Sequence, residues 1–332
     1  MAQRVTITDV ARVAGVSVST VSKVINARDG VARSTFSHVT GVIDDLGYEG
    51  SLVARSLRSA TTWVIGVLVA GFEPFSAEIL MGAARELEDG DYDLLAYTGS
   101  QRGGGVGWER RYLSRLSGTL IDGAVIVTPT VVDADPGVPV VAIDPHAGPL
   151  GLPTVDSDNY GGGLLATRHL LELGHRRIGF VAGRPDLESS RQREAGYRDA
   201  LAEAGIAVEP DLIRVGDYMR DSAHVPATEL LSLAEPPTAI FAANDQSAIG
   251  VLDVAERLGL HVPGQLSVVG FDDIPDSAQS VPPLTTIHQP LQDMGAAAIR
   301  LLLKLISGAP LESNHIRMPV SLVRRGSTAP PG

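Results

Sequence analysis

Hydrogen-bonding side chains follow four of the β-strands that the sequence predicts. They come directly after apolar runs, and they are Asp144, the pair Asn244-Asp245, the pair Asp272-Asp273, and the pair His288-Gln289. In open α/β sheets, ligands bind beyond the carboxyl ends of the strands, where such side chains meet. Carboxylates accept hydrogen bonds and amides both donate and accept them, which suits a ligand rich in hydroxyl groups. An Asp or Asn after a strand is also a common helix cap, and Asn244-Asp245 could cap a helix that begins at Gln246.

These positions depend on strands and helices that alternate from Trp63 onward. Apolar strands are predicted at 64–69, 93–97, 124–127, 177–182, 239–242 and 266–271, with helices at 77–88, 108–116, 191–203 and 246–257. Such alternation is typical of parallel sheets covered by helices. Because the pattern runs through two series, one before and one after Asn159, we expect an α/β domain of two lobes with a cleft between them.

The first 25 residues carry a different pattern, two short helices around Gly15. Thr6 and Asp9 have the spacing of a capping box, and Ser17 can cap the second helix. Apolar residues recur at helical spacing in both helices: Val10, Ala11 and Ala14 in the first, and Val21, Val24 and Ile25 in the second. This arrangement is typical of an all-α helix-turn-helix head, although any two small helices separated by a glycine give a similar pattern.

The exposed face of the second helix has side chains that could read DNA. Lys23 can donate to guanine O6 and N7, and Ser19 and Thr20 can reach bases or phosphates. The methyl groups of Val18 can pack on thymine methyl groups. Because these side chains are short, the helix could lie deep in the major groove.

Charge is unevenly distributed along the 332 residues. The net charge is −12, but residues 1–60 hold seven Lys and Arg against five acidic residues, so they carry +2 and the remainder −14. An acidic body would orient the basic end toward DNA. The chain has no cysteine, which excludes disulfides, thiolate metal sites and cysteine nucleophiles. It has neither a long apolar run nor a leader-like N-terminus, so we expect a cytoplasmic protein without membrane contact.

Residues Val5 to Asn26 resemble the signature of the lactose repressor (LacI/GalR) family of bacterial regulators, and the similarity continues along the chain. Leu46-Gly47-Tyr48 and Ala54-Arg55-Ser56-Leu57 resemble the end of the family's third helix and its hinge helix. The resemblance implies a DNA-binding head at 1–50 and a hinge at 51–62 whose Leu57 enters the minor groove, although a leucine taken alone would more often belong to a core. The predicted DNA-binding residues are Thr6, Ser17, Val18, Ser19, Thr20, Ser22, Lys23, Asn26, Ala54, Arg55 and Leu57.

The resemblance also implies a ligand-binding and dimerisation domain at 63–325 that is folded like a periplasmic sugar-binding protein. The chain would cross between the lobes near 159–163, 288–291 and 319–322, with Gly161-Gly162-Gly163 allowing hinge motion. Arg193 matches the family's ligand-binding arginine, although Arg191 or Arg193 could instead form an ion pair that closes the lobes. The predicted ligand-binding residues are Phe75, Asp144, Arg193, Tyr218, Asn244, Asp272 and Gln289, with Phe75 and Tyr218 offering flat faces to a ring. Residues 326–332 would form a loose tail.

Several positions depart from the family pattern. Ala32 stands where a serine or threonine usually caps the third helix, and Phe36 and His38 occupy positions that are often basic. Gly50-Ser51 replaces the usual Pro-Asn before the hinge, and Ala70 replaces a polar residue of the ligand site. The changes in the head and hinge remove phosphate donors and pre-organisation, so we expect weaker or more salt-sensitive operator binding.

These observations predict a ligand-responsive repressor that binds a pseudo-palindromic operator as a homodimer and is controlled by a small sugar. A nucleoside or purine effector is the alternative. The chain shows no nucleophile elbow, phosphate loop or zinc-pair spacing, so we expect neither an enzyme nor a cofactor or metal. A plain sugar-binding protein would explain the cleft but not the head, and a sugar-modifying enzyme would have to turn over the bound sugar.

Overall fold

The computed structural model describes residues 5–25, 29–48, 61–99, 107–117, 120–130, 137–148 and 151–332. The chain divides into two compact units, residues 1–62 and 63–332. The predicted DNA contacts Asn26, Ala54, Arg55 and Leu57 lie outside the described residues, as does Gly50-Ser51. Among the described residues, no helix combines the length and the apolar character that crossing a membrane requires.

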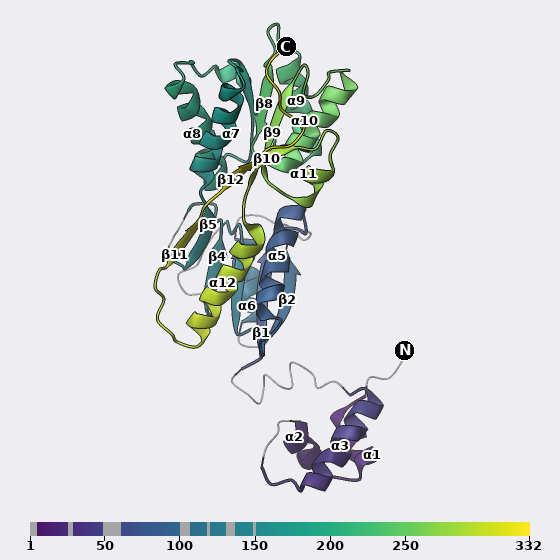
Figure 1. Cartoon of the computed structure of the whole chain (residues 1–332). Helices are drawn as coiled ribbons and strands as arrows, with labels where there is room; N and C mark the ends of the chain where they lie inside the picture. The colour runs from purple at the N-terminus through teal and green to yellow at the C-terminus, as the bar shows by residue number, and fades with distance from the viewer. Residues whose placement is uncertain are drawn as a thin grey trace. The chain divides into compact units, whose positions relative to one another are not determined.

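The N-terminal unit packs its described helices around valine and alanine side chains (Figure 1). These helices are α1 (Ile7–Ala14), α2 (Val18–Ile25) and α3 (Arg33–Leu46). The predicted capping box is confirmed, because the Thr6 amide donates to the Asp9 carboxylate at 3.0 Å and the Asp9 amide donates back to the Thr6 hydroxyl. Ser17 caps α2 as predicted, accepting from the Thr20 amide at 3.1 Å. Local hydrogen bonds therefore fix where the first two helices begin.

The start of α3 differs from the other two helix starts. Ala32 precedes it and supplies no side-chain hydrogen bond, whereas Gly47 ends the helix in the left-handed conformation with φ of 57°. His38 Nε2 lies 3.2 Å from the carbonyl oxygen of Ala14, so this side chain ties α3 to α1. His38 stands at a position that is often basic in the family. Here it makes a structural contact within the head.

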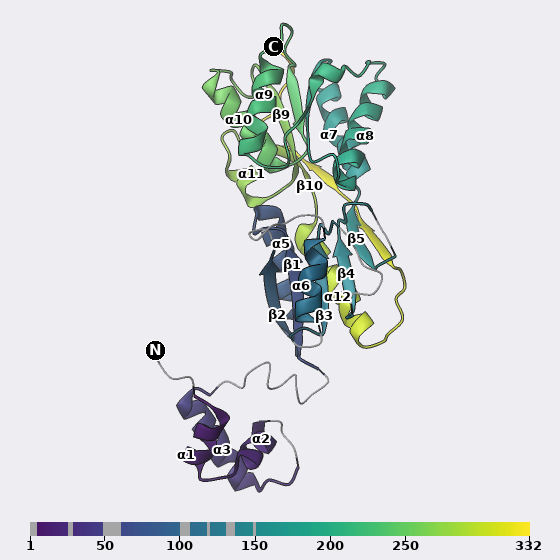
Figure 2. The ribbon, with the colours of Figure 1, turned by 180° about the vertical axis from the view of Figure 1, so that it is seen from behind.

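The second unit contains two lobes, each built on a six-stranded sheet (Figure 1). The first sheet has the order β11-β5-β4-β3-β1-β2, and all its neighbouring strands are parallel. Its strands are β1 (Val64–Val69), β2 (Asp93–Thr98), β3 (Gly123–Val127), β4 (Val140–Ile143), β5 (Thr154–Ser157) and β11 (His315–Met318). One face is covered by α5 (Pro74–Leu87) and α12 (Leu291–Ile306), and the other by α6 (Trp108–Leu116), as Figure 2 shows.

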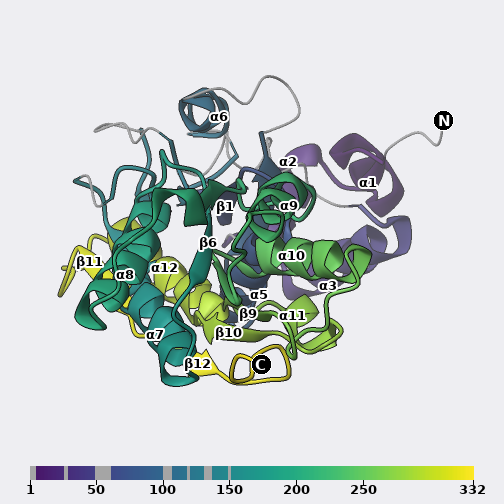
Figure 3. The same cartoon turned by 90° about the horizontal axis from the view of Figure 1, so that it is seen from above.

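The second sheet has the order β12-β10-β9-β8-β6-β7 and is parallel except for β12. Its strands are β6 (Ile178–Ala182), β7 (Ile213–Val215), β8 (Ala239–Ala242), β9 (Ser267–Asp272), β10 (Thr285–His288) and β12 (Ser321–Val323). Figure 3 shows α7 (Asn159–Glu172) and α8 (Glu188–Glu203) on one face, and α9 (His224–Leu231) and α10 (Asp245–Arg257) on the other. The predicted two-lobed α/β fold is confirmed, with α5 and α8 each beginning three residues earlier than expected.

The chain passes between the lobes where β5 leads into α7, where β10 leads into α12, and where β11 leads into β12. At the first of these connections, Gly163 lies inside α7 and faces α8. A Cβ atom built on Gly163 would lie 2.4 Å from the carbonyl oxygen of Arg193, and one on Gly196 would lie 2.4 Å from that of Tyr160. Gly163 therefore allows close packing of the two helices, and the hinge role of Gly161-Gly162-Gly163 stays a prediction.

Residues 326–332 are packed against the second lobe, so the expectation of a loose tail is wrong. Ser327 is fully buried, and its hydroxyl donates to the Val268 carbonyl at 2.6 Å while accepting from the Thr285 amide at 2.8 Å. Two buried histidines continue this attachment. His169 Nε2 lies 3.0 Å from Thr328 Oγ1, and His175 Nε2 lies 2.9 Å from the Ala329 carbonyl oxygen. The tail thus satisfies polar groups that the sheet would otherwise leave unpaired.

Candidate functional site

Arg193 lies at the centre of the predicted ligand site and is only 3% exposed. Its Nε donates to Asn159 Oδ1 at 2.8 Å, and its Nη1 donates to the Ala243 carbonyl at 2.6 Å and to Asp272 Oδ1 at 3.4 Å. The guanidinium carbon lies 3.7 Å from the centroid of the Phe271 ring. A buried charge needs such partners because removing it from water costs several kcal/mol. The site is therefore built around a guanidinium that protein groups hold in place.

A closed chain of hydrogen bonds passes through this guanidinium and joins the two lobes. Gln289 Nε2 donates to Asp272 Oδ1 at 2.6 Å, and the Ser157 hydroxyl donates to Gln289 Oε1. Asn159 Nδ2 completes the circuit by donating to the Ser157 carbonyl at 3.2 Å. Ser157 ends β5 of the first lobe, whereas Asp272 ends β9 of the second. We call these five residues the interlobe ring: Ser157, Asn159, Arg193, Asp272 and Gln289.

Two buried carboxyl groups flank Arg193, one from each lobe. Burial raises the pKa of Asp272 to about 6, although the positive charge of Arg193 acts in the opposite direction. Burial also raises the pKa of Asp144, which follows β4 and accepts a hydrogen bond from Asn159 Nδ2 at 3.4 Å. The charge of Arg193 thus acts on two carboxyl groups, and donors from Asn159 and Gln289 complete their contacts.

The backbone at these positions is in the left-handed region, which non-glycine residues seldom adopt. The φ angle is 48° at Asp144, 64° at Tyr218 and 114° at Asp272. Such residues cost on the order of 1–3 kcal/mol each and cluster at ligand sites. At Asp272 this conformation departs from the regular strand, so that Phe271 and Asp272 both contact the same guanidinium.

Tyr218 borders the site with a buried hydroxyl group. Its ring lies flat against Gly183, where a built Cβ would lie 2.1 Å from Tyr218 Cζ. Within the described part of the chain, the Tyr218 hydroxyl makes no hydrogen bond of good geometry, although the side chains of Ser189 and Ser190 lie near it, and burial raises its pKa. The guanidinium carbon of Arg193 lies 5.6 Å from the centroid of this ring. A buried, unpaired hydroxyl beside Arg193 is a group that a ligand could satisfy.

Asn244 and Phe75 have different surroundings from the other predicted ligand residues. Asn244 Oδ1 accepts from the Ser247 amide at 2.9 Å, so its side chain caps α10, and its Nδ2 donates to the Tyr218 carbonyl at 3.0 Å. The helix-cap interpretation is therefore confirmed for Asn244. Phe75 lies in the first turn of α5, where it packs, half-buried, on the core of the first lobe.

Sequence reasoning missed Ser157, Asn159 and Phe271 as parts of the site. Asn159 had a signal, because it comes two residues after β5 in the same way that the other polar residues follow their strands. Phe271 had none, since an apolar residue inside a buried strand looks like any other core residue. Its contact with Arg193 depends on the backbone conformation at Asp272.

The predicted DNA-reading face of α2 is exposed in the N-terminal unit. Val18, Ser19 and Lys23 are exposed, whereas Thr20 and Ser22 are half-buried. The Ser17 hydroxyl lies 2.7 Å from the hydroxyl of Ser19 and 2.8 Å from that of Thr20. Thr6 likewise donates its hydroxyl to the Asp9 carboxylate at 2.7 Å. Thr6 and Ser17 are therefore helix caps with hydroxyl groups that already have partners.

A helix-turn-helix head followed by a two-lobed domain with a buried polar site defines a class, the ligand-responsive transcription regulators. Residues 6–51 match the model of the lacI family of bacterial regulatory proteins, and residues 167–328 match that of a periplasmic binding protein-like domain. The transcriptional repressor PurR of Photobacterium profundum is 36% identical over 333 residues, covering 97% of this chain and 98% of the relative. The chain belongs to the lacI family.

Further relatives support this membership over the full length. The transcriptional regulator CelR of Thermobifida fusca is 35% identical over 344 residues, covering 98% of each chain. Among solved structures, a lac repressor dimer bound to operator and an anti-inducer is 29% identical with a TM-score of 0.82, covering 98% of this chain and all of that one. The protein is thus a DNA-binding transcriptional repressor with a ligand-binding domain, as predicted, and is not an enzyme.

Proposed function

We propose that this repressor binds a pseudo-palindromic operator as a homodimer and that a small sugar, bound at the interlobe ring, sets its affinity for the operator. The observation that carries the proposal is the buried Arg193, which is bonded within a ring that includes side chains from both lobes. A ligand that bonds to Arg193 and Asp272 competes with the ring. It therefore changes the contacts that hold the lobes in this arrangement.

The chemistry of the site suits a sugar. A planar guanidinium can bridge neighbouring hydroxyl groups, and carboxylates accept hydrogen bonds from the others. The Tyr218 hydroxyl and ring add a polar group and a flat apolar surface beside Arg193. A relative that is 33% identical, with a TM-score of 0.72, was solved as a CelR–cellobiose complex, and another that is 28% identical was solved with bound ribose. These relatives support a sugar as the effector.

The proposed DNA contacts come from the exposed face of α2 and from the hinge. Val18, Ser19 and Lys23 would contact bases, and the helix starts at Thr6 and Ser17 would face phosphates. Leu57 would enter the minor groove, as the family resemblance implies. Dimerisation would place two heads on the two half-sites of an operator. Because a repressor acts on chromosomal DNA, we place the protein in the cytoplasm.

A thermal-shift screen tests the ligand site. Glucose, ribose and cellobiose are compared with adenine, guanine and their nucleosides, because a ligand that binds only the folded state raises the melting temperature. We expect a sugar to raise it in the native protein, and Arg193→Met to abolish that rise. Arg198→Met is the matched control, since Arg198 lies in the same helix but is exposed and pairs with Glu194.

The screen separates the alternatives. A response to purines or nucleosides alone would replace the sugar by a purine effector. A sugar response that survives Arg193→Met would show that the ligand binds elsewhere. If neither group of compounds raises the melting temperature, the proposal of a sugar or purine effector fails, whereas family membership and DNA binding stand.

A further inference from the structure

The turn after β9 is held at three consecutive residues, each by different partners. Asp272 belongs to the interlobe ring, Asp273 is bonded to Arg325 and His288, and the Ile274 amide donates to Asp245 Oδ2 at 3.0 Å. The φ angles of 114° at Asp272 and 61° at Asp273 are both in the left-handed region. Two adjacent residues in this conformation persist only when their surroundings hold them firmly.

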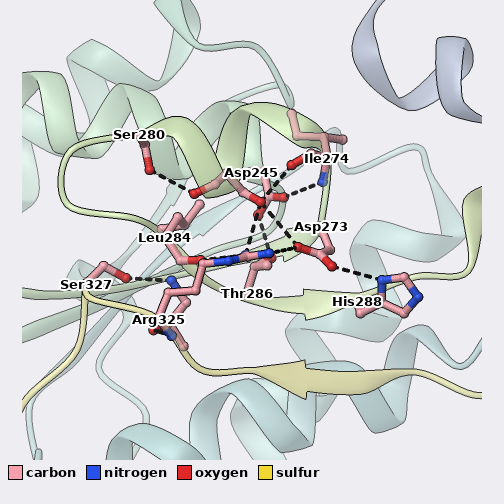
Figure 4. Close-up of polar contacts among 11 residues, drawn as sticks. Asp245, Asp273, Ile274, Ser280, Leu284, Thr286, His288, Arg325 and Ser327 are labelled. Carbon is pink, nitrogen blue, oxygen red and sulfur yellow. Dashed lines mark hydrogen bonds and ion pairs between the residues drawn. The ribbon is translucent and has the colours of Figure 1, made fainter.

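The Asp273 carboxylate ties this turn to two later parts of the chain (Figure 4). Its Oδ1 accepts from Arg325 Nη2 at 2.6 Å, and its Oδ2 lies 3.0 Å from His288 Nδ1. The side chains of Asp273 and Arg325 are 16% and 20% exposed, so solvent screens their ion pair only in part. Arg325 Nη1 also donates to the Leu284 carbonyl at 2.9 Å, which fixes the guanidinium in place.

Asp245 anchors the other end of the turn. It is fully buried, and its Oδ1 accepts from Thr286 Oγ1 at 2.5 Å while its Oδ2 accepts from the Ile274 amide. Asp245 lies at the start of α10 and Thr286 lies within β10. Asp245 lies in the interior of the second lobe and holds the Ile274 amide there. We therefore expect a movement of the turn to occur at Asp272 and Asp273.

One partner of Asp273 stands beside a connection between the lobes, and the other follows the strand into which a second connection leads. His288 is the last residue of β10 and directly precedes Gln289, which belongs to the interlobe ring and leads to α12. Arg325 lies two residues after β12, the strand that receives the chain from β11 of the first lobe. The Asp273 carboxylate therefore links the end of β10, where one connection begins, to the residue that follows β12, the strand into which another connection leads.

We propose that Asp273 is a positioning residue that couples Asp272 to these two interlobe connections. The inference rests on the proposed function, in which Asp272 contacts the effector. An effector that forms a hydrogen bond with the Asp272 carboxylate shifts the turn. Because Asp273 is bonded to His288 and Arg325, these two residues move with it. Asp273 itself stays bonded to the protein and needs no contact with the effector.

A double-mutant cycle in the full-length protein without ligand tests this coupling. Asp272→Asn perturbs the ring, and amide hydrogen exchange is followed in peptides that cover 285–291 and 319–326. In the native background we expect Asp272→Asn to change exchange rates in both segments by about fivefold or more. In the Asp273→Asn background we expect the same substitution to change them less than about twofold.

Asp253→Asn is the matched control, because Asp253 is also bonded to an arginine and a histidine, Arg220 and His224, but lies within α10. The full response to Asp272→Asn should persist in that background. Equal responses in the native and Asp273→Asn backgrounds would overturn the proposal, as would the absence of any response in the native protein. If Asp273→Asn does not fold, Arg325→Lys replaces it, because this substitution weakens the ion pair between Arg325 and Asp273. A full response to Asp272→Asn in the Arg325→Lys background would then overturn the proposal. Since no effector is used, a failed ligand screen and a failed coupling test are separate results.

Discussion

At the scale of single residues, Asp272 links burial to protonation. Its pKa is raised from 3.8 to about 6 in the folded protein, so between about pH 4 and pH 6 the folded state binds more protons than the unfolded state. The free energy of unfolding therefore falls as the pH rises through this window. A pKa that is raised by roughly 2 corresponds to a change of at most about 3 kcal/mol in the free energy of unfolding. Stability is lost because, at the higher pH, the folded protein has to keep the charged Asp272 carboxylate in a buried site.

Asp272→Asn should remove this pH dependence. We expect the native protein to lose on the order of 1–3 kcal/mol more stability than the variant between pH 4.5 and pH 7.5. Urea unfolding at both pH values measures the difference. This difference includes the response of Asp245, because the nearby Asp272 carboxylate raises the pKa of that group. Parallel pH profiles would contradict the assignment of a raised pKa to Asp272.

The residues that could be predicted in this site are those with a local signal. Asp144, Asp272 and Gln289 are polar residues that directly follow apolar strands, and the ends of parallel strands meet at one edge of a sheet. Asn244 carries the same signal, but its side chain caps α10. The sequence alone cannot tell whether such a side chain joins the ligand site or caps a helix. The answer depends on how far the side chain lies from the start of the helix that follows it.

At the scale of elements, the site depends on how closely α7 and α8 approach each other. α7 carries Asn159 and α8 carries Arg193, and the two helices meet at Gly163 and Gly196. Gly163→Ala places a methyl group against backbone atoms of α8 that cannot rotate away. We expect a loss of about 1–3 kcal/mol in the free energy of unfolding, together with weaker binding of the sugar found in the screen.

Denaturant unfolding and calorimetric titration measure the two effects of Gly163→Ala. Gly41→Ala in α3 is the control, because nothing lies within 4 Å of the added methyl group and alanine favours a helix by about 1 kcal/mol over glycine. An unchanged stability of Gly163→Ala would mean that the helices can separate at no cost. The close approach would then not position Arg193.

The elements show why local patterns predict some parts of a fold and not others. The alternation of strands and helices was readable because each element has its own periodicity. The C-terminal segment from Gly326 has small and polar residues without periodicity, which indicated a loose tail. Its order comes from hydrogen bonds to Val268 and Thr285, which lie far away in sequence. Contacts of this kind leave no local signal in the residues that make them.

At the scale of the whole molecule, the chain separates two kinds of binding by charge. The first 60 residues carry +2 and the remaining residues −14, so phosphate contacts must come from the head and hinge. The proposed effector site is neutral or acidic apart from Arg193 and lies in the acidic unit. Substitutions in one unit should therefore mainly change the affinity of that unit for its own ligand. Binding of one ligand should change the affinity for the other by a coupling free energy of about 1–3 kcal/mol.

Leu57→Ala tests this separation. If Leu57 enters a base step, its loss should weaken operator binding by about tenfold or more and leave the affinity for the sugar unchanged. The slope of operator affinity against salt concentration should also stay the same, because leucine neutralises no phosphate. Titrations of labelled operator at several salt concentrations measure both quantities. Leu165→Ala, which removes an exposed leucine from α7, is the control. Unchanged operator affinity in Leu57→Ala would place this leucine outside the DNA interface, and the remaining affinity would then have to come from α2 and its phosphate contacts.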